Sequence, residues 1–350
     1  MTNLMAEIGQ QPAALSGLRK YYTSPGAIPA KALRKLVAHW PPTVVFTGMG
    51  SSLFAAYPAQ AFLTSQGIRA LVWETAELLH HHMKVLGPDT LLVVVSQSGE
   101  TVEILRLLEA LPEKVGMIAL VNVEKSTLAQ RAKLYLPMMA GGQKTVSTKT
   151  YTCAVAVLMY LAFAVTRKSS GPLTQALLQA IEAEEKILDR YEVLVPPTVE
   201  FFNQPPYVLL MSRGADLSSA YQGSLMFKEV VRLGAEAMSA AQFRHGPIEI
   251  INPSHRYVIF ARQTPQARAG KLLLKLAGDI RSHGGRVLLL ADSPFKDITN
   301  VRLIKLEPIP LGLGTLVDSV FIQLLTHDLA LRAGLEPGKF WIAEDVTREE

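Results

Sequence analysis

The sequence predicts an α/β protein with two doubly wound parallel-sheet domains related by internal duplication. Three observations support this class. Apolar, β-rich runs alternate with helical patterns, the alternation begins near residue 43 and again near residue 207, and in both copies the first strand ends in a Gly-containing polar loop. Continuous apolar strands separated by helices indicate a parallel sheet that is covered on both faces.

The first copy begins with the apolar run TVVFTG at 43–48, which leads into MGSS and a helical stretch. Further strands are expected at 70–74, 91–96, 115–122 and 134–138, with helices around 76–84, 101–111 and 126–132. The apolar run at 152–165 is shorter than the roughly 20 residues of a membrane span, so it predicts a buried core helix.

Two Pro pairs in YEVLVPPTVEFFNQPPY indicate a boundary between the copies. We therefore predict an N-terminal, phosphate-binding domain over residues 1–195 and a C-terminal domain over residues 196–350. In the second copy, strands are expected within 207–216 and at 256–261, 286–292 and 301–307, with a helix over 267–285.

The composition argues against several classes of protein. The formal charge is +5, but Lys and Arg are scattered, so no nucleic-acid-binding arm is expected. One cysteine, Cys153, excludes an internal disulfide and fits a reducing cytoplasm. The N-terminus has neither a basic start nor an apolar core, so we expect no secretory signal and no membrane association. GMGSSL lacks the third glycine of a dinucleotide fingerprint and no P-loop occurs, so we expect no nucleotide and no other cofactor.

Three polar clusters follow predicted strands or precede a helix: GMGSS at 48–52, SQSGET at 96–101 and TVSTKT at 145–150. Ligands of an open parallel sheet bind beyond the carboxyl ends of its strands. A phosphate monoester needs several convergent donors, and hydroxyls with backbone N–H groups at a helix start provide them. The suitable side chains are Ser52, Ser96, Gln97, Ser98, Thr101 and Ser147. Helix capping alone also explains one such cluster, but three together favour a phosphate site.

These clusters, in the order SQSGET, STKT and HGP, resemble the sugar isomerase (SIS) family, in particular the isomerase half of glucosamine-6-phosphate synthase and its stand-alone relatives. The similarity begins at MAEIGQQP (5–12) and covers nearly the whole chain. It implies two SIS subdomains and a homodimer with shared active sites. It also implies that Val146 and Ser147 line the sugar of a hexose phosphate, while Lys149 is either a site-lining cation or a helix-start residue.

The resemblance further implies two catalytic residues in the second half. Glu229 matches the family's proton-transferring glutamate, and His245 matches its ring-opening histidine, which comes from the neighbouring subunit. A carboxylate over an enediol moves a proton between C1 and C2, and imidazole suits acid–base work at the ring oxygen. Without the resemblance, both would be interpreted as ordinary surface or loop residues.

Two lysines of the synthase are absent. Met226 stands three residues before Glu229, and Ala343, Glu344 and Asp345 occupy the C-terminal position. The chain also lacks a glutaminase domain. Three interpretations stay open: an amino-sugar-phosphate isomerase or deaminase, a deglycase of fructosamine 6-phosphates, and a non-catalytic phosphosugar sensor.

A run of three histidines, HHHMK at 80–84, raises the question of a metal. Consecutive side chains on a helix point about 100° apart, so they do not converge on one ion. We therefore expect no metal site.

Overall fold

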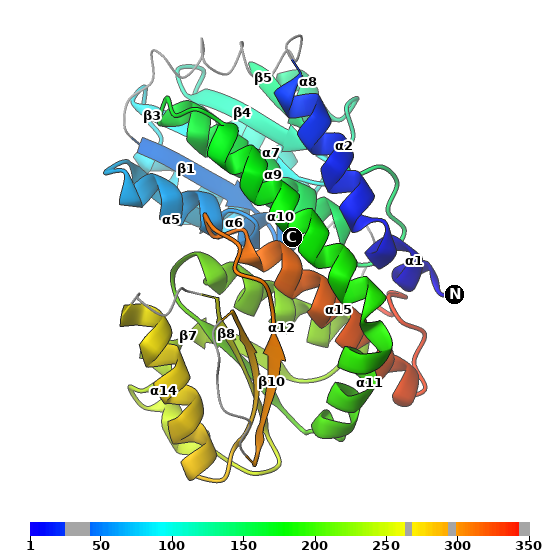
Figure 1. Ribbon diagram of the computed structural model, residues 1–350. Helices are drawn as coiled ribbons and strands as arrows, with labels where there is room; N and C mark the ends of the chain where they lie inside the picture. Colours follow the sequence, from blue (N-terminus) through cyan, green and yellow to red (C-terminus); the bar gives the residue numbers. More distant parts are fainter. Residues whose placement is uncertain (25–42, 263–267, 293–298, 343–350) are drawn as a thin grey trace. The chain divides into compact units, whose positions relative to one another are not determined.

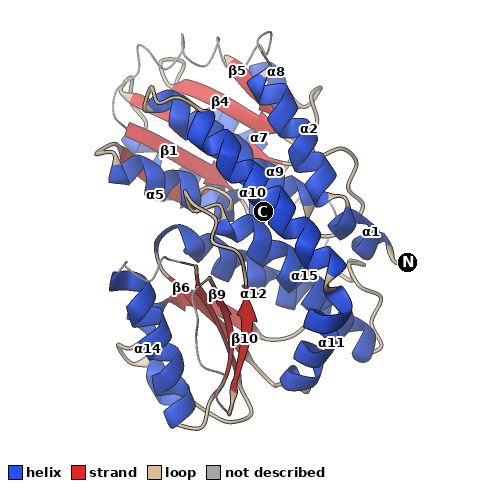
Figure 2. Ribbon diagram, viewed as in Figure 1, coloured by secondary structure: helices blue, strands red, loops and turns tan. Residues whose placement is uncertain are grey.

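The computed structural model describes residues 1–24, 43–262, 268–292 and 299–342. It confirms the predicted class, with two five-stranded parallel sheets flanked by helices (Figures 1 and 2). The chain divides into two compact units, which we describe separately. The sheet-1 unit comprises Ala13–Gln143, Lys149–Leu178 and Phe340–Glu350, and the sheet-2 unit comprises Met1–Pro12, Lys144–Thr148 and Gln179–Lys339. The domain boundary after residue 195 stays a prediction.

Sheet 1 has the strand order β2-β1-β3-β4-β5, and all its neighbouring strands run parallel. Its strands are β1 (Thr43–Gly48), β2 (Arg69–Glu74), β3 (Thr90–Ser96), β4 (Gly116–Val121) and β5 (Leu134–Pro137). The helices of the unit are α4 (Ser51–Phe54), α5 (Tyr57–Ser65), α6 (Thr75–Glu77), the π turn η1 (Leu78–His82), the 3-10 turn η2 (Met83–Val85), α7 (Val102–Ala110), α8 (Thr127–Arg131) and α9 (Lys149–Val165). Helices α2 (Gln11–Thr23) and α10 (Gly171–Asp189) contribute residues to both units.

Apolar side chains fill both faces of sheet 1. One face packs against α7 and α8 through a buried cluster that includes Leu92, Ile104 and Leu128. Helix α9 lies on the opposite face from α7 (Figure 1), and every residue from Lys149 to Phe163 in it is buried. This confirms that the apolar run at 152–165 forms a core helix. Among the described residues, no helix is both long and apolar enough to span a membrane.

Sheet 2 has the order β10-β9-β8-β6-β7, which is the order of sheet 1 repeated in the second half of the chain. Its strands are β6 (Val208–Ser212), β7 (Ala235–Ser239), β8 (Arg256–Ala261), β9 (Arg286–Ala291) and β10 (Val301–Lys305). The helices and turns of this unit are α1 (Asn3–Gly9), α11 (Tyr191–Phe202), η3 (Gly214–Asp216), α12 (Leu217–Val231), α13 (Ala240–Phe243), η4 (Pro247–Ile250), α14 (Arg268–Ser282) and α15 (Gly314–Arg332). The shared order confirms the predicted duplication.

Helices cover sheet 2 on both faces. Alternate residues of β6 point to opposite faces: Leu209 and Met211 belong to the buried cluster under α14, whereas Leu210 lies against Gly223 of α12. The apolar stripe of α14 therefore faces one side of the sheet, and α12 packs on the other.

Two local features differ from expectation. Strand β7 was not predicted, because its residues are mostly half-buried or exposed at the sheet edge and form no continuous apolar run. Helix α11 continues through Pro196 and Pro197. A Pro pair interrupts backbone hydrogen bonding, yet the buried side chains of Leu194, Val195 and Phe202 hold this segment in place as a helix.

The packing of α12 gives a stability prediction. A Cβ on Gly223 would lie 2.6 Å from Leu210 Cδ2, so Gly223→Ala is expected to destabilise the protein by about 1–3 kcal/mol through overpacking. Gly278 in α14 has no atom within 4 Å of its Cβ position, and Gly278→Ala should stabilise by about 0.5–1 kcal/mol. Urea unfolding of both variants measures the contrast, and equal effects would contradict this packing.

Candidate functional site

The polar clusters of the first half follow two adjacent strands. From β1 the chain moves outward to β2 on one side and then to β3 on the other, so the topological switch point lies between β1 and β3. Thr47 pairs with Val94 near the carboxyl ends of these strands. In doubly wound sheets the crevice at this point is the usual ligand site. The structure therefore brings the loop after β1, with Ser52, beside the loop after β3.

The turn after β3 is shaped by Gly99, which has a φ of +71°. The Gly99 N–H donates to Ser96 Oγ at 2.9 Å, and the Glu100 N–H donates to Ser98 Oγ at 3.2 Å. Each hydroxyl thus accepts a bond inside the turn. Its own O–H remains available to donate to a ligand oxygen.

Thr101 is the N-cap residue of α7, with extended backbone and no side-chain capping bond. Its Oγ1 is buried and has no hydrogen-bond partner among the described residues. The unpaired N–H groups and dipole of a helix N-terminus favour an anion. An unpartnered hydroxyl beside them is a further donor for such a ligand.

The acidic side chain of this turn is engaged elsewhere. The Glu100 carboxylate accepts bonds from Thr127 N at 2.5 Å and from Thr127 Oγ1 at 3.0 Å, at the start of α8. The Gln97 carbonyl accepts from Asn122 N at 3.1 Å. These bonds tie the turn after β3 to the segment after β4.

Ser52 lies half-buried in α4, two residues after Gly50, whose φ is +50°. A Cβ at the neighbouring Gly48 would lie 2.8 Å from the Val95 carbonyl oxygen. The two strand ends therefore approach closely because residue 48 has no side chain.

The third cluster is divided. Val146 and Ser147 belong to the sheet-2 unit, and Lys149 belongs to the sheet-1 unit. Val146 is buried, and the Ser147 carbonyl accepts from Gln222 Nε2 at 3.3 Å. Lys149 is buried at the start of α9, where its Nζ donates to the Gly142 carbonyl at 2.6 Å.

Glu229 and His245 both lie in the sheet-2 unit. Glu229 is half-buried in the last turn of α12, and no ion pair joins it to a described residue. Burial raises the pKa of its carboxyl to about 7. A carboxyl that titrates near neutrality is suited to acid–base chemistry. His245 is exposed just after α13, where its N–H donates to the Gln242 carbonyl at 3.0 Å.

The corresponding strand ends of sheet 2 carry different chemistry. Gly214 follows β6 with a φ of +60°, as Gly50 follows β1, and Asp216 then stands where the first half has Ser52. Arg262 follows β8 as Gln97 follows β3. Arg262 Nε lies 3.2 Å from Asp318 Oδ1, and Ser219 Oγ donates to Asp318 Oδ2 at 2.8 Å. The second switch point is therefore filled by internal charges.

The pKa values of the Asp216 and Asp318 carboxyls are both raised. Burial, helped by the Asp318 carboxylate, raises the pKa of Asp216 to about 8, against the opposing effect of Arg262. Burial likewise raises the pKa of Asp318 to about 6, although Arg262 and Ser219 act to lower it. Asp318 pairs with Arg262, the cation at this strand end, and no such carboxylate pairs with the hydroxyls after β3 among the described residues, so the two copies are not equivalent as anion sites.

The three histidines lie around the π turn that ends at His82. The His82 ring stacks on Trp73 with ring centroids 4.7 Å apart. Within the described ranges, no group of three or more His, Cys, Asp or Glu side chains is arranged to hold a metal ion.

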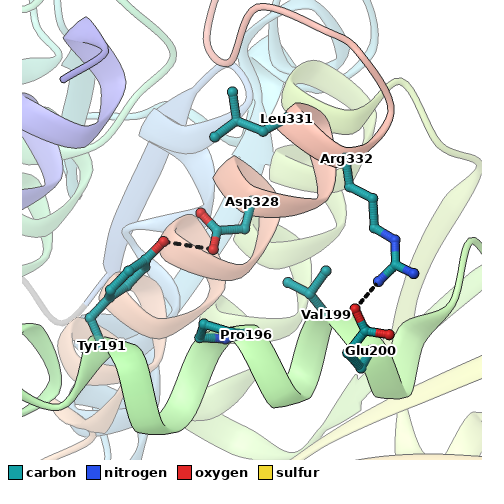
Figure 3. Close-up of a pocket in the computed structure, with 7 residues that line it drawn as sticks. All are labelled: Tyr191, Pro196, Val199, Glu200, Asp328, Leu331 and Arg332. Carbon is teal, nitrogen blue, oxygen red and sulfur yellow. Dashed lines mark hydrogen bonds and ion pairs between the residues drawn. The ribbon is translucent and has the colours of Figure 1, made fainter.

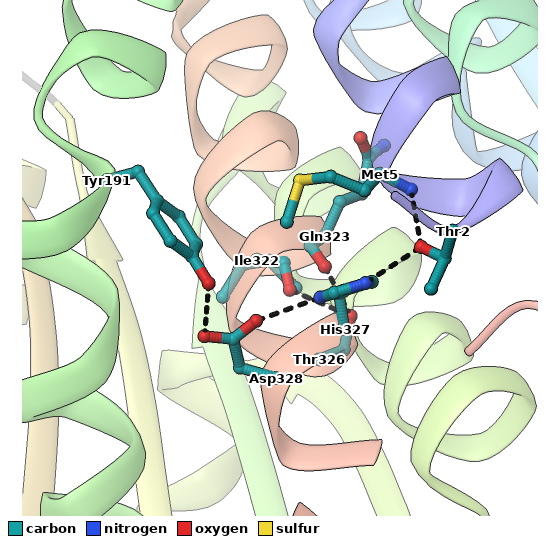
Figure 4. Close-up of polar contacts among 8 residues, drawn as sticks. All are labelled: Thr2, Met5, Tyr191, Ile322, Gln323, Thr326, His327 and Asp328. Carbon is teal, nitrogen blue, oxygen red and sulfur yellow. Dashed lines mark hydrogen bonds and ion pairs between the residues drawn. The ribbon is translucent and has the colours of Figure 1, made fainter. Parts of the chain in front are cut away.

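A surface groove of about 390 Å³ between α11 and α15 was not predicted by any sequence motif (Figure 3). Tyr191 OH donates to Asp328 Oδ2 at 2.7 Å, and Arg332 Nη1 lies 2.6 Å from Glu200 Oε1. Asp328 also contacts His327, which in turn contacts Thr2 (Figure 4). This polar chain joins three helices of the sheet-2 unit.

Comparisons with known proteins show which family model and which relatives the chain matches. Residues 37–165 match the family model of the SIS domain. The isomerizing glutamine–fructose-6-phosphate aminotransferase of Bartonella quintana (strain Toulouse) is 25% identical over 347 residues, which are 94% of this chain and 56% of the relative. The same enzyme of Yersinia pestis is 27% identical over 353 residues, which are 95% of this chain and 56% of the relative. The chain thus spans about 56% of the length of these relatives.

Solved structures share the fold. The C-terminal domain of the glucosamine-fructose-6-phosphate aminotransferase from Francisella tularensis has a TM-score of 0.85 at 21% identity, covering 100% of this chain and 98% of that one. Tagatose-6-phosphate ketose/aldose isomerase from Escherichia coli has a TM-score of 0.80 at 19% identity, covering 98% and 97%. Glucosamine-6-phosphate deaminase from Thermotoga maritima has a TM-score of 0.77 at 18% identity, covering 99% and 100%.

The buried carboxyl at the second switch point predicts a pH effect on stability. Because the pKa of Asp216 is raised to about 8 in the folded protein, its contribution to stability is full below the unfolded value of about 4 and is lost as pH rises through about 8. Asp216→Asn should therefore flatten the fall in Tm that this group causes between about pH 4 and pH 8. The exposed Asp89 supplies the control, because Asp89→Asn should leave the profile unchanged. An Asp216→Asn profile that falls as steeply as the wild-type profile between about pH 4 and pH 8 would contradict the assignment.

Proposed function

Since this chain contains a SIS domain and repeats its strand order in a second sheet, we propose that it is a phosphosugar isomerase-type enzyme. Its substrate is an amino-sugar or fructosamine 6-phosphate, and the reaction takes place at C1 and C2. The observation that carries the proposal is the β1/β3 switch point, where hydroxyls with free donors surround a helix N-terminus.

In this proposal the phosphate binds to hydroxyl and amide donors at the switch point. The residues are Ser52, Ser96, Gln97, Ser98 and Thr101. A phosphate monoester offers three acceptor oxygens, and the turn supplies O–H donors, with the N–H groups of α7 nearby. Val146 and Ser147 line the sugar. Lys149 is proposed to line the site as well. Its Nζ donates to the Gly142 carbonyl, so its contribution is to fix the backbone there rather than to bind the substrate as a cation.

The chemistry requires a proton to move between two carbons. Glu229 removes a proton from the carbon next to the carbonyl or imine and returns it to the other carbon, through an enediol or enolamine. Its raised pKa supports this role, because a base with a pKa near 7 is both ionised and basic at neutral pH. His245, supplied by the second subunit of a homodimer, exchanges the proton at the ring oxygen when the cyclic sugar opens.

The missing lysines limit the reaction type. Met226 is buried three residues before Glu229 and has no amine; Ala343, Glu344 and Asp345 lie outside the described residues. The proposal therefore includes no Schiff base from these positions. The remaining Glu229 with its perturbed pKa favours an enzyme over a non-catalytic sensor. In this proposal the enzyme is a cytoplasmic homodimer, and its reaction uses neither a cofactor nor a metal.

A turnover screen tests the function. The protein is offered glucosamine 6-phosphate, fructose 6-phosphate and several fructosyl-amino-acid 6-phosphates, and products are identified by mass spectrometry. Interconversion indicates an isomerase, released ammonia a deaminase, and a released amino acid a deglycase. Tight binding without turnover of any compound would contradict the enzyme and leave a sensor.

Replacing the proton-transferring carboxylate separates binding from chemistry. Glu229→Gln is expected to lower kcat by about 10²–10⁴-fold while the Kd for the phosphosugar stays within about twofold, because no phosphate donor is changed. Glu182→Gln removes an exposed glutamate on α10 and should change neither value. Full turnover by Glu229→Gln would exclude the proposed role.

The same carboxyl predicts the pH dependence of activity. A general base must be ionised, and the pKa of Glu229 is about 7. The value of kcat/KM should therefore fall about tenfold per pH unit below that pKa and level off above it. A pH–rate profile that stays flat from pH 5 to pH 8 would rule out Glu229 as the base.

Loss of the unpartnered hydroxyl tests the phosphate site. Thr101→Val removes a buried Oγ1 that has no described partner, so stability should be unchanged or slightly higher. Phosphosugar affinity should fall about tenfold, since a hydrogen bond to a charged group contributes about 1.5–3 kcal/mol. Thr64→Val on the exposed side of α5 is the control. Calorimetric titration measures both, and unchanged affinity in Thr101→Val would remove Thr101 from the site.

A further inference from the structure

The segment Lys144–Thr148 belongs to the sheet-2 unit although the stretches before and after it belong to the sheet-1 unit. It carries Val146 and Ser147, the residues proposed to line the sugar. The sequence motif MAEIGQQP at 5–12 contributed to the family resemblance, yet the proposed reaction gives it no role. The structure connects this motif with the segment.

Glu7 of α1 makes that connection. Its Oε1 accepts from Lys144 N at 2.5 Å, and its Oε2 accepts from Thr145 N at 3.3 Å and from the Thr145 hydroxyl. The Glu7 side chain is buried, with 6% exposure. A buried carboxylate that accepts several charge-assisted bonds fixes the groups that donate them.

Helix α1 is itself a fixed support. Thr2 Oγ1 lies 2.9 Å from His327 Nε2, and Gln11 Nε2 donates to Gln323 Oε1 at 2.7 Å (Figure 4 shows the first of these contacts). Leu4 and Ile8 are fully buried. These contacts anchor α1 on α15, so the Glu7 carboxylate is presented from a rigid element.

The segment is also held from its other end. Gln222 Nε2 donates to the Ser147 carbonyl at 3.3 Å, and Gln222 lies two turns before Glu229 on α12. A Cβ on Gly338 would lie 3.0 Å from Thr145 Cβ, so the backbone there packs closely on the segment.

We propose that Glu7 is a positioning residue that holds Lys144–Thr148 in the conformation in which Val146 and Ser147 meet the sugar. This inference rests on the proposed function. The hydrogen bonding of the segment supports this role. Two backbone N–H groups donate to two different oxygens of the Glu7 side chain, and only a carboxylate offers two acceptor oxygens. The amide of glutamine has one acceptor oxygen, and its NH₂ group would face an N–H donor.

The test compares Glu7→Gln with Thr2→Ala in the full-length protein. Thr2 caps α1 and contacts His327, so Thr2→Ala reports weakened anchoring of α1 while the bonds of the Glu7 carboxylate to the segment are kept. The ligand is the hexose 6-phosphate that the wild type turns over, or fructose 6-phosphate as an equilibrium ligand if none is turned over. The readouts are KM and kcat, or Kd, together with amide hydrogen exchange at Lys144 and Thr145.

Glu7→Gln is expected to raise KM or Kd about tenfold, with kcat within about twofold, and to speed exchange at both amides. Glu7→Asp should recover part of the affinity because it restores both acceptor oxygens. Thr2→Ala weakens the anchoring of α1 but keeps the Glu7 carboxylate, so it should lower Tm and raise KM by less than Glu7→Gln does. If Glu7→Gln leaves affinity or exchange unchanged, or if Thr2→Ala raises KM equally, the positioning role is wrong. Wild-type protein that binds none of the sugar phosphates would instead contradict the proposed function.

Discussion

The close approach of Gly99 to Ser126 is the constraint on which the first-half site depends. A Cβ at residue 99 would lie 2.5 Å from Ser126 Oγ, and the φ of +71° also favours glycine. This contact lets the turn after β3 close on itself, so that Ser96 and Ser98 accept bonds from Gly99 and Glu100. The next residue, Thr101, is the N-cap of α7. One short turn therefore brings together the hydroxyls of Ser96 and Ser98 and the N-terminus of α7 with its dipole.

The duplication shows that a shared backbone does not preserve a shared function. Both sheets have the same strand order and a glycine of positive φ two residues after their first strand. In the first half this geometry presents hydroxyls. In the second it presents the buried Asp216, and a buried ion pair joins Arg262 to Asp318 nearby. The sheet-2 unit instead supplies α12 and the segment Lys144–Thr148, which bear Glu229, Val146 and Ser147, residues proposed to act on or line the sugar.

Much of the fold could be predicted from sequence because parallel strands buried on both faces appear as continuous apolar runs. Strand β8 was predicted at its observed bounds, Arg256–Ala261. Edge strand β7 was missed because packing, not apolar periodicity, defines it. The donors of SQSGET could be predicted from residue type and position after a strand. The hydrogen bonds of Glu7 to Lys144 and Thr145 could not be predicted from the sequence. They join residues 137 and 138 positions apart, and no local sequence pattern marks them. The raised pKa of Glu229 likewise depends on tertiary burial.

Of the two switch points, the one between β1 and β3 is proposed to bind the phosphate of a sugar phosphate. A crystal structure of the protein soaked with a hexose 6-phosphate tests it most directly. The account predicts electron density for the phosphate within hydrogen-bond distance of the Ser96, Ser98 and Thr101 hydroxyls, and none at Asp216 and Arg262. A phosphate bound at the β6/β8 switch point, or one remote from both sheet edges, would contradict the account.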